Sequence, residues 1–424
     1  MKLAKLIINI VQTKTVNHFV ITSFGTAVNG FLGLLFYIVV ARILGPASFG
    51  ILTVAVASIA LISDMADLGI DTGLLRFVSK YDPQNNNKAL KFIKFGLEIK
   101  LAVWLLFLLI GWFLAPLVAQ RFFLKSEFLI PLRLALIGAG GAMIFSLGTH
   151  AIQAYQKFWS WNLINIGMNA LRLTAIAALI LTYGLNIYST LAIYIATPFL
   201  GFFTTLFFLP NYLSVKAEQS VAVEFFHYSK WVALVGVLGA ASSRLDIFIS
   251  ARFLTSAQVG VYSVASQLTV VIPQLIFALA TVVAPKLSSF SDDRKALIYL
   301  KKLQLLICGL VLLGIVIIPA FKFLIPLIYG QSYYASTTPF VILFIAQLLF
   351  LLAMPSHQAI FYYFANPKIF TWISIGQLLI TAVLGWFLVP SLGIIGAAVT
   401  ILVSNFFSLI ISSIWVVCSF AKKE

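Results

Sequence analysis

The sequence predicts an all-α integral membrane protein with about twelve transmembrane helices. Hydrophobic residues make up 62% of its 424 residues, charged residues make up only 9%, and the mean hydropathy is +1.06. A soluble protein of this length could not bury so much apolar surface, whereas a bilayer solvates it. We therefore assign one membrane crossing to each apolar run of roughly 20 residues. The predicted spans lie near residues 18–41, 49–76, 95–119, 128–153, 160–183, 187–210, 230–253, 259–285, 303–325, 336–362, 369–390 and 393–418.

The distribution of basic residues predicts the orientation of these spans. The chain carries 28 Lys and Arg residues against 12 Asp and Glu residues, a formal net charge of +16. With the N-terminus inside, the outer segments hold only Arg42, Arg121, Lys125 and Arg252. Because short cytoplasmic loops are rich in Lys and Arg, we expect a multi-pass protein of the cell (inner or plasma) membrane with both termini in the cytoplasm. Basic residues placed in this way argue against nucleic acid as a partner.

An internal repeat at an offset of about 210 residues predicts two related halves. The segment ARILGPASFGILTVA at 41–55 aligns without gaps on ARFLTSAQVGVYSVA at 251–265, so that Gly50 matches Gly260. Each half holds six predicted spans, an even number, so both halves enter the membrane in the same sense. We expect two parallel six-helix bundles, 1–215 and 216–424, related by a pseudo-two-fold axis along the membrane normal. Alternating access would then open a central cavity between the bundles to either side.

Residues 42–81, RILGPASFGILTVAVASIALISDMADLGIDTGLLRFVSKY, resemble the opening of the polysaccharide transporter family. The resemblance rests on an R-x-L-G-P-x-x-F-G turn, an apolar helix and the D-x-G element Asp67-Leu68-Gly69. That family includes the Wzx-type flippases for O-antigen (lipopolysaccharide) and exopolysaccharide repeat units, and it shares a superfamily with the multidrug and toxin extrusion (MATE) transporters. The resemblance implies a MATE-like fold and the movement of polyprenyl diphosphate-linked oligosaccharides from the inner to the outer leaflet. The second-half turn, residues 253–260, departs from the pattern because it lacks the Gly-Pro pair.

Two arginines fall near the middle of predicted spans and are candidates for substrate binding. Arg244 lies about 12 Å along its helix from Arg252, and Arg172 is central in the fifth span. A guanidinium at this depth suits a cavity that receives an anion, because it binds phosphate oxygens in a bidentate manner. The alternative is a structural ion pair of either arginine with Asp246. Asp246 points away from Arg244 on the same helix, so we expect it to act as the counterion of another arginine.

Three carboxylates of the second span, Asp64, Asp67 and Asp71, are spaced to share one helix face. Such a stripe predicts a coupling site for protons or sodium, or else a hydrated vestibule with salt bridges to Arg76 or Lys80. Lys100 is expected to extend from its span to the interface. Pro273 and Gln274 lie near the middle of the eighth span, where a proline kink is a candidate for gating.

The sequence predicts a transporter and not an enzyme. It contains no G-x-x-x-x-G-K-[ST] motif, no metal-ligand cluster and no recognisable catalytic triad, so we expect no cofactor. The expected partners are a lipid-linked oligosaccharide, membrane lipids and a coupling ion. One alternative is a cation or drug antiporter of the same superfamily, which needs a cavity dominated by acidic groups. A less favoured alternative is a membrane-embedded glycan polymerase or ligase, which needs a longer external loop.

Overall fold

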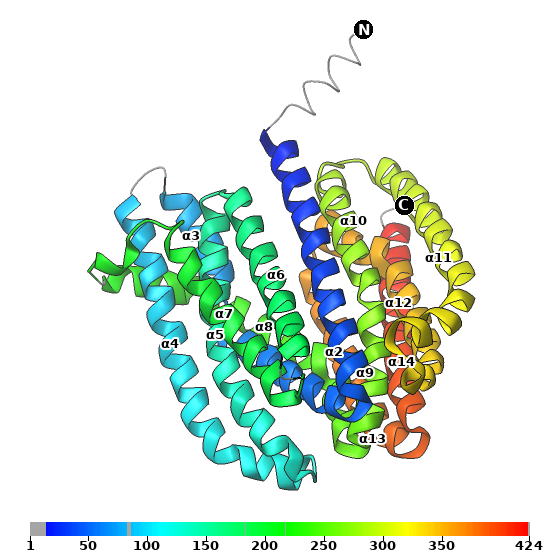
Figure 1. The fold of residues 1–424 in the computed structure, drawn as a ribbon. Coiled ribbons are helices and arrows are strands. Elements are labelled where there is room, and N and C mark those ends of the chain that lie inside the picture. The colour runs from blue at the N-terminus through cyan, green and yellow to red at the C-terminus, as the bar shows by residue number, and fades with distance from the viewer. Residues whose placement is uncertain (1–13, 83–85, 183, 217, 423–424) are drawn as a thin grey trace. The chain divides into compact units, whose positions relative to one another are not determined.

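The computed structural model describes residues 14–82, 86–182, 184–216 and 218–422, and these residues are almost entirely helical (Figure 1). Within these ranges, ten helical segments are long and apolar enough to cross a membrane. The first of them, Ile21–Ala66, joins two predicted spans at Gly45, and α8 (Gln219–Phe253) covers the predicted span near 230–253. The all-α membrane class is therefore confirmed.

The chain folds into two compact units. The first comprises residues 1–40 and 55–240, and the second comprises residues 41–54 and 241–424. These units are defined by how closely the residues pack, whereas the bundles expected at 1–215 and 216–424 are defined by the sequence repeat. The units therefore do not test the bundles, which stay a prediction. The remaining long helices are α2 (Lys14–Ala66), α3 (Ile70–Tyr81), α4 (Asn86–Leu117), α5 (Leu129–Ala154), α6 (Phe158–Thr182), α7 (Ile187–Leu206), α9 (Ser256–Thr269), α10 (Val271–Ser288), α11 (Asp293–Tyr329), α12 (Thr337–Gln358), α13 (Pro367–Leu392) and α14 (Ile394–Ala421).

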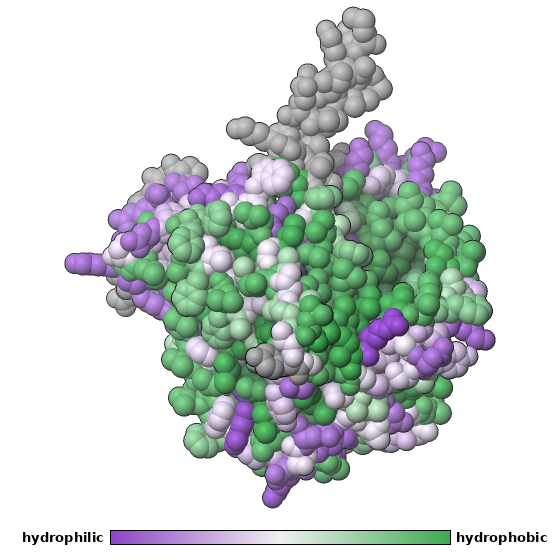
Figure 2. Space-filling view, viewed as in Figure 1, coloured by the Kyte–Doolittle hydropathy of each residue, from purple (hydrophilic) through white to green (hydrophobic). Residues whose placement is uncertain are grey.

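Large apolar side chains are exposed along the outer faces of several helices. Phe113 on α4 is 79% exposed and Val316 on α11 is 76% exposed, and each has exposed leucine neighbours on its helix. Figure 2 shows that hydrophobic side chains cover most of the visible face and that hydrophilic ones gather towards the helix ends. Exposure of so large an apolar surface to water would be energetically unfavourable, so these helix faces contact lipid.

The internal repeat appears in the second unit as a reciprocal contact between two helix segments. A Cβ atom built on Gly50 would lie 1.9 Å from the backbone oxygen of Ser256, and one built on Gly260 would lie 2.0 Å from that of Pro46. Pro46 and Ser256 are repeat equivalents, as are Gly50 and Gly260. Gly50 therefore packs against Ser256 in the same way that Gly260 packs against Pro46. Two segments related by a two-fold axis make paired contacts of this kind. Only glycine permits so close an approach.

The second predicted span is broken at the D-x-G element. α2 ends at Ala66 and α3 begins at Ile70, because Leu68 and Gly69 adopt left-handed conformations with φ of 50° and 75°. Glycine accepts this conformation without strain, whereas leucine does so at a cost of about 1–2 kcal/mol. The Asp67 carboxylate supports the turn by accepting a hydrogen bond from the backbone N–H of Asp71 at 3.3 Å. Asp64, which precedes the break, therefore cannot share one helix stripe with Asp71, contrary to the prediction.

The connection between α7 and α8 and the first turns of α8 are held to α4 by basic residues. Lys91 donates a hydrogen bond to Glu218 at 2.7 Å, and Lys88 donates one to Glu224 at 2.9 Å. The hydrogen bond from Lys91 lowers the pKa of the Glu218 carboxyl below its ordinary value. Beside these pairs, Phe225 inserts its buried ring among the aromatic residues of α3 and α4. Lys88 and Lys91, which contribute to the positive charge that predicts the orientation, thus also bind the region between α7 and α8.

In the second unit the eighth predicted span is interrupted at Val270, which separates α9 from α10. Pro273 lies on the C-terminal side of the interruption and lacks the N–H group that would bond to Thr269 one turn earlier. Gln274 restores the ladder by donating its backbone N–H to the carbonyl of Val270 at 3.2 Å. A proline-dependent irregularity is therefore present, and its role in gating stays a prediction.

Candidate functional site

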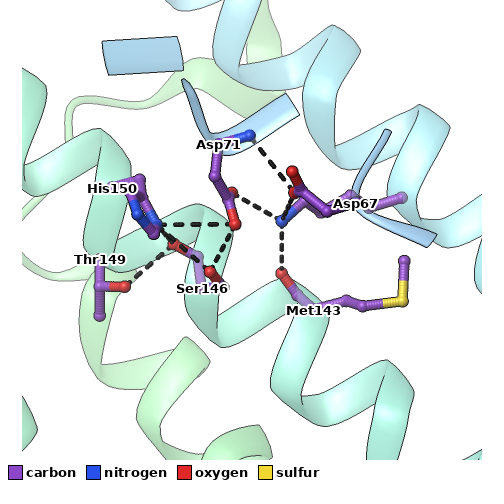
Figure 3. A network of polar contacts seen from close by, with 7 residues as sticks. Asp67, Asp71, Met143, Ser146, Thr149 and His150 are labelled. Atoms are coloured by element: carbon purple, nitrogen blue, oxygen red, sulfur yellow. Dashed lines mark hydrogen bonds and ion pairs between the residues drawn. The ribbon is translucent and has the colours of Figure 1, made fainter. Parts of the chain in front are cut away.

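A buried charged network lies in the first unit where α3, α4 and α5 meet (Figure 3). The ammonium group of Lys100 contacts one oxygen of Asp67 at 2.8 Å and one oxygen of Asp71 at 2.6 Å. It also donates a hydrogen bond to the backbone oxygen of Met143 at 3.2 Å. The Lys100 side chain is 1% exposed, so these three oxygens replace its water.

The network continues from the second oxygen of Asp71 onto α5. The hydroxyl of Ser146 donates a hydrogen bond to Asp71 Oδ2 at 2.5 Å. His150 Nδ1 lies 2.8 Å from the backbone oxygen of Ser146 and 3.6 Å from Asp71 Oδ2. Thr149 donates its hydroxyl to the same backbone oxygen at 2.9 Å. Figure 3 shows Ser146 and His150 approaching Asp71 from one side and Asp67 from the other, while the Thr149 hydroxyl is directed at the Ser146 backbone oxygen.

Local structure explains why these groups meet. Met143, Ser146 and His150 follow one another at spacings of three and four residues, so they lie on one face of α5. The left-handed turn at Leu68 and Gly69 redirects the chain so that the carboxylates on both sides of it reach the same ammonium. Lys100 enters from α4, about 21 Å along the helix axis from its first residue. Three helices and one turn thus build the site.

The formal charges of the network do not cancel when both carboxylates are ionised and His150 is neutral. Two carboxylates and one ammonium leave a charge of −1 in a region where Asp67 and Asp71 are 22% and 13% exposed. An uncompensated charge inside a membrane protein is costly, so such groups mark ion or proton pathways in transporters. The arrangement can hold one additional positive charge. Among the described residues, no group of three His, Cys, Asp or Glu side chains is placed to bind a metal ion.

The structure corrects the predicted partners of the acidic residues. Lys80 lies 3.8 Å from Glu224 instead of pairing with the carboxylates of the second span. The expectation that Lys100 reaches the interface is wrong, because its ammonium is buried between Asp67 and Asp71. The sequence did contain a signal for these ion pairs, because a lysine lies well inside one apolar span and acidic residues lie in the span before it. Ser146 and His150 carried no such signal, because polar residues of their types also serve as helix contacts.

Arg172 sits on α6 in a cage of aromatic rings. Its guanidinium lies 4.4 Å from the centre of the Tyr194 ring and 5.5 Å from that of Phe36, and its Nε donates a hydrogen bond to Thr197 at 3.2 Å. None of the ion pairs in the described part of the chain involves Arg172. The rings stabilise the cation and hold it in place. The two terminal nitrogens of a guanidinium held in this way suit a planar or tetrahedral anion.

Arg244 and Asp246 are not joined by an ion pair in the described part of the chain. Asp246 accepts a hydrogen bond from the hydroxyl of Tyr262 at 2.7 Å. This neutral donor, rather than a second arginine, holds the carboxylate of Asp246. The Nε atom of Arg244 is buried and has no hydrogen-bond partner among the described residues. A buried donor without a partner is costly, and a ligand that accepts a hydrogen bond would remove that cost.

Comparison with protein families identifies one match. A family described as polysaccharide biosynthesis protein matches residues 39–339, which is more than half of the chain. The matched region includes the segment at 42–81 on which the sequence resemblance rests, as well as the network around Lys100. A comparison with curated protein sequences finds no significant match.

Solved structures of similar fold cover nearly the whole chain. The lipid II flippase MurJ in an inward closed conformation aligns with a TM-score of 0.76 and 16% identity over 95% of this chain and 89% of its own. An inward-facing MATE family transporter aligns with a TM-score of 0.74 and 15% identity over 93% and 95%. A transporter of the same superfamily from Pyrococcus furiosus aligns with a TM-score of 0.65 and 13% identity over 95% and 94%. These likenesses confirm the MATE-like fold, and the proteins concerned are transporters or flippases rather than enzymes.

Proposed function

The chain belongs to the polysaccharide biosynthesis protein family, and from this premise we propose that it flips lipid-linked oligosaccharides across the membrane. The proposed substrate is an oligosaccharide repeat unit on a polyprenyl diphosphate, moved from the cytoplasmic to the outer leaflet by alternating access. The family match over residues 39–339 carries this proposal. It is supported by the likeness to a lipid II flippase, because lipid II flipping also moves a lipid between leaflets.

The chemistry of the two mid-span arginines supports an anionic substrate. Arg172 has no acidic partner in the described ion pairs, and Arg244 has a buried nitrogen without an acceptor. A diphosphate offers several oxygens to such donors, and charge-assisted hydrogen bonds to phosphate are among the strongest in proteins. We propose that each of these arginines, considered within its own unit, is able to bind a phosphate group of the substrate.

The alternative of a cation or drug antiporter receives less support from the structure. Such a protein needs acidic groups that are available to its substrate. In the first unit Asp67 and Asp71 already contact the Lys100 ammonium, and Ser146 donates a further hydrogen bond to Asp71. In the second unit Tyr262 donates to Asp246. Uptake of a lipophilic cation by proteoliposomes, with no exchange of lipid-linked glycan, would favour this alternative.

We propose the cell membrane as the location, with both termini in the cytoplasm. The basic residues that predict this orientation include Lys88 and Lys91, which lie beside the connection between α7 and α8. Cysteine labelling with a membrane-impermeant reagent tests the orientation, because a cysteine placed at Lys88 should react only after the membrane is permeabilised. Labelling from the outside would reverse the proposed topology.

A leaflet-exchange assay tests the flippase proposal. Purified protein is reconstituted into liposomes with a fluorescent polyprenyl diphosphate oligosaccharide, and an impermeant quencher reports the labelled lipid in the outer leaflet over time. Wild-type protein should exchange the lipid faster than empty liposomes. Arg172→Gln should slow the exchange about 10-fold or more, because a charge-assisted hydrogen bond contributes about 1.5–3 kcal/mol.

Arg121→Gln is the matched control for this measurement, because Arg121 is exposed in the short helix that follows α4. The control should exchange lipid at the wild-type rate. Equal rates for wild-type protein and empty liposomes, with several glycan lengths, would contradict the proposed function. Equal slowing by both substitutions would show a general effect of positive charge and not a diphosphate contact.

A further inference from the structure

One face of α6 carries a row of polar side chains that ends at Arg172. Asn165, Asn169 and Arg172 are spaced by four and three residues, so they lie on one side of the helix over about 10 Å of its length. All three are half-buried. The exposed apolar side chains Trp159 and Leu163 mark the lipid-facing side of α6, and the row lies about 100–160° around the helix axis from them. The row is therefore turned away from lipid, as polar groups in a membrane require.

The part of α2 that belongs to the first unit also contributes to this row. Asn169 donates a hydrogen bond from Nδ2 to the Oδ1 atom of Asn29 at 2.5 Å. Thr26, one turn before Asn29, is exposed. Both α2 residues lie about 150° around the helix axis from the exposed rings of Phe24 and Phe31, which mark the lipid-facing side. Polar groups of two helices thus share one surface that is turned away from lipid.

Several polar atoms along this row have no partner in the part of the chain that the structure describes. Asn165 and Asn169 use their amide nitrogens, in hydrogen bonds to the backbone oxygen of Trp161 at 2.8 Å and to Asn29, which leaves both Oδ1 atoms as acceptors. Asn29 accepts in its hydrogen bond, so its Nδ2 remains a donor. Arg172 uses only Nε, so its two terminal nitrogens remain. The row therefore offers both donors and acceptors to a ligand.

Open space adjoins the end of the row that is nearer to Arg172. Gly33 of α2 lies one turn before Phe36, whose ring is 5.5 Å from the guanidinium of Arg172. A Cβ atom built on Gly33 would meet no atom of the described residues within 4 Å. At Gly25, two turns earlier, a Cβ atom would lie only 1.8 Å from Oδ1 of Asn162. The two helices thus pack tightly at one end of the row and leave room at the other.

The chemistry of the row matches a sugar that is joined to a phosphate. A sugar hydroxyl both donates and accepts hydrogen bonds, so side-chain amides with an available oxygen or nitrogen bind neighbouring hydroxyls. The Tyr194 ring, 4.4 Å from the guanidinium of Arg172, offers an apolar face to the C–H groups of a sugar ring. The terminal nitrogens of Arg172 suit a phosphate. A ligand that uses the whole row must carry hydroxyl and phosphate groups within about 10 Å of each other.

We propose that this row binds the sugar next to the diphosphate of the substrate, with Asn29, Asn165 and Asn169 as partners of its hydroxyls. The inference rests on the proposed function, because it takes the phosphate contact of Arg172 from there. It adds a basis for selecting the substrate. A sugar that lacks one of the hydroxyls leaves an amide without its partner and binds more weakly. Arg172 alone would bind a lipid diphosphate whether or not a glycan is attached.

Equilibrium binding to the detergent-purified protein tests the sugar contact without any transport assay. The probes are short isoprenyl diphosphates that carry glucose, galactose, N-acetylglucosamine or N-acetylgalactosamine, and the same isoprenyl diphosphate without a sugar. At least one glycosylated probe should bind wild-type protein about 10-fold or more tightly than the sugar-free probe. Equal affinities for all the probes would overturn the proposal.

Substitutions along the row separate the sugar contact from the phosphate contact. Asn165→Ala and Asn169→Ala should each weaken binding of the preferred glycosylated probe about 5-fold or more, and should leave the affinity for the sugar-free probe unchanged. Gly33→Leu fills the open space and removes no hydrogen-bonding group, so it should also weaken binding of the glycosylated probe. Arg172→Gln should weaken binding of both probes, because both carry the diphosphate.

Thr174→Val is the matched control on the same helix. Thr174 is exposed, and its hydroxyl donates to the backbone oxygen of Leu171 at 3.0 Å, so the change should leave both affinities unchanged. Equal weakening of both probes by the asparagine variants would overturn the proposal, as would unchanged binding of the glycosylated probe. If Asn169→Ala does not fold, Asn165→Ala and Gly33→Leu still decide between these results.

Leaflet exchange connects the sugar site with transport. With both lipids at one low concentration, wild-type protein should exchange a glycosylated polyprenyl diphosphate about 5-fold or more faster than the sugar-free lipid, and Asn165→Ala should reduce that ratio. If wild-type protein exchanges both lipids at one rate, the inference about selection fails and the flippase function stands. If the glycosylated probe binds as expected but no lipid moves faster than in empty liposomes, the proposed function fails and the sugar site stands.

Discussion

Lys100→Met is expected to lower the free energy of unfolding by about 3–5 kcal/mol, the largest effect that we predict for a single substitution. The change removes the ammonium that lies 2.8 and 2.6 Å from Asp67 and Asp71, and leaves two carboxylates facing each other in a buried place. The carboxylates repel each other, and burial keeps water from compensating them. Thermal unfolding of the detergent-purified protein, followed by tryptophan fluorescence, measures the loss.

Lys322→Met is the matched control, because Lys322 lies on α11 with an exposed side chain. It should change stability by no more than about 0.5 kcal/mol. Combining Lys100→Met with Asp71→Asn should cost less than the sum of the two single changes, because the second change removes one of the unpaired charges. Strict additivity would show that Lys100 and Asp71 do not interact, which contradicts the geometry described above.

Gly50→Ala and Gly260→Ala are each expected to cost about 1–3 kcal/mol of stability. The added methyl group would lie 1.9 Å from the backbone oxygen of Ser256 in the first variant and 2.0 Å from that of Pro46 in the second. Backbone atoms cannot rotate away as a side-chain end can, so the helix segments must separate. The two variants should be destabilised by similar amounts, because the contacts are related by the repeat.

Gly33→Ala serves as the comparison, because no atom lies within 4 Å of a Cβ built at that position of α2. Alanine has the higher helix propensity, so this variant should be stabilised by about 0.5–1 kcal/mol. The same thermal unfolding measurement covers all three variants. If Gly50→Ala proves as stable as Gly33→Ala, the two segments do not approach each other as closely as described.

The helix positions were predictable because each depends on a local property of the chain. A run of apolar residues crosses a bilayer wherever it occurs, so hydropathy alone located the spans near 95–119 and 303–325, which lie within the apolar helical segments Asn86–Phe122 and Asp293–Tyr329. The repeat was legible for a similar reason, since Arg42 and Gly50 have counterparts in register at Arg252 and Gly260. The family resemblance at 42–81 rested on the same stretch and is confirmed by the match over 39–339.

The site was only partly predictable because helical periodicity assumes an unbroken helix. Asp67 and Asp71 were singled out in the sequence and both contact Lys100, while their role as a coupling site stays a prediction. The stripe that included Asp64 depends on regular dihedral angles through Leu68 and Gly69. Those two residues are left-handed, so the geometry of the turn replaces the periodicity. The irregularity near Pro273 was easier to predict, because a missing N–H group disrupts a helix wherever it occurs. The boundary between α9 and α10 lies nearby at Val270.

Composition and pattern were sufficient to determine that this protein crosses the membrane many times, that its two halves are related and that it resembles polysaccharide transporters. Only the tertiary structure decided which charges meet. Lys100 and Asp71 lie 29 residues apart on separate helices, and Ser146 and His150 come from a third. The free energy of a buried charge depends on what surrounds it in space, and no spacing along the chain encodes that. The same structure showed that the glycines found by aligning the repeat lie against each other's segments.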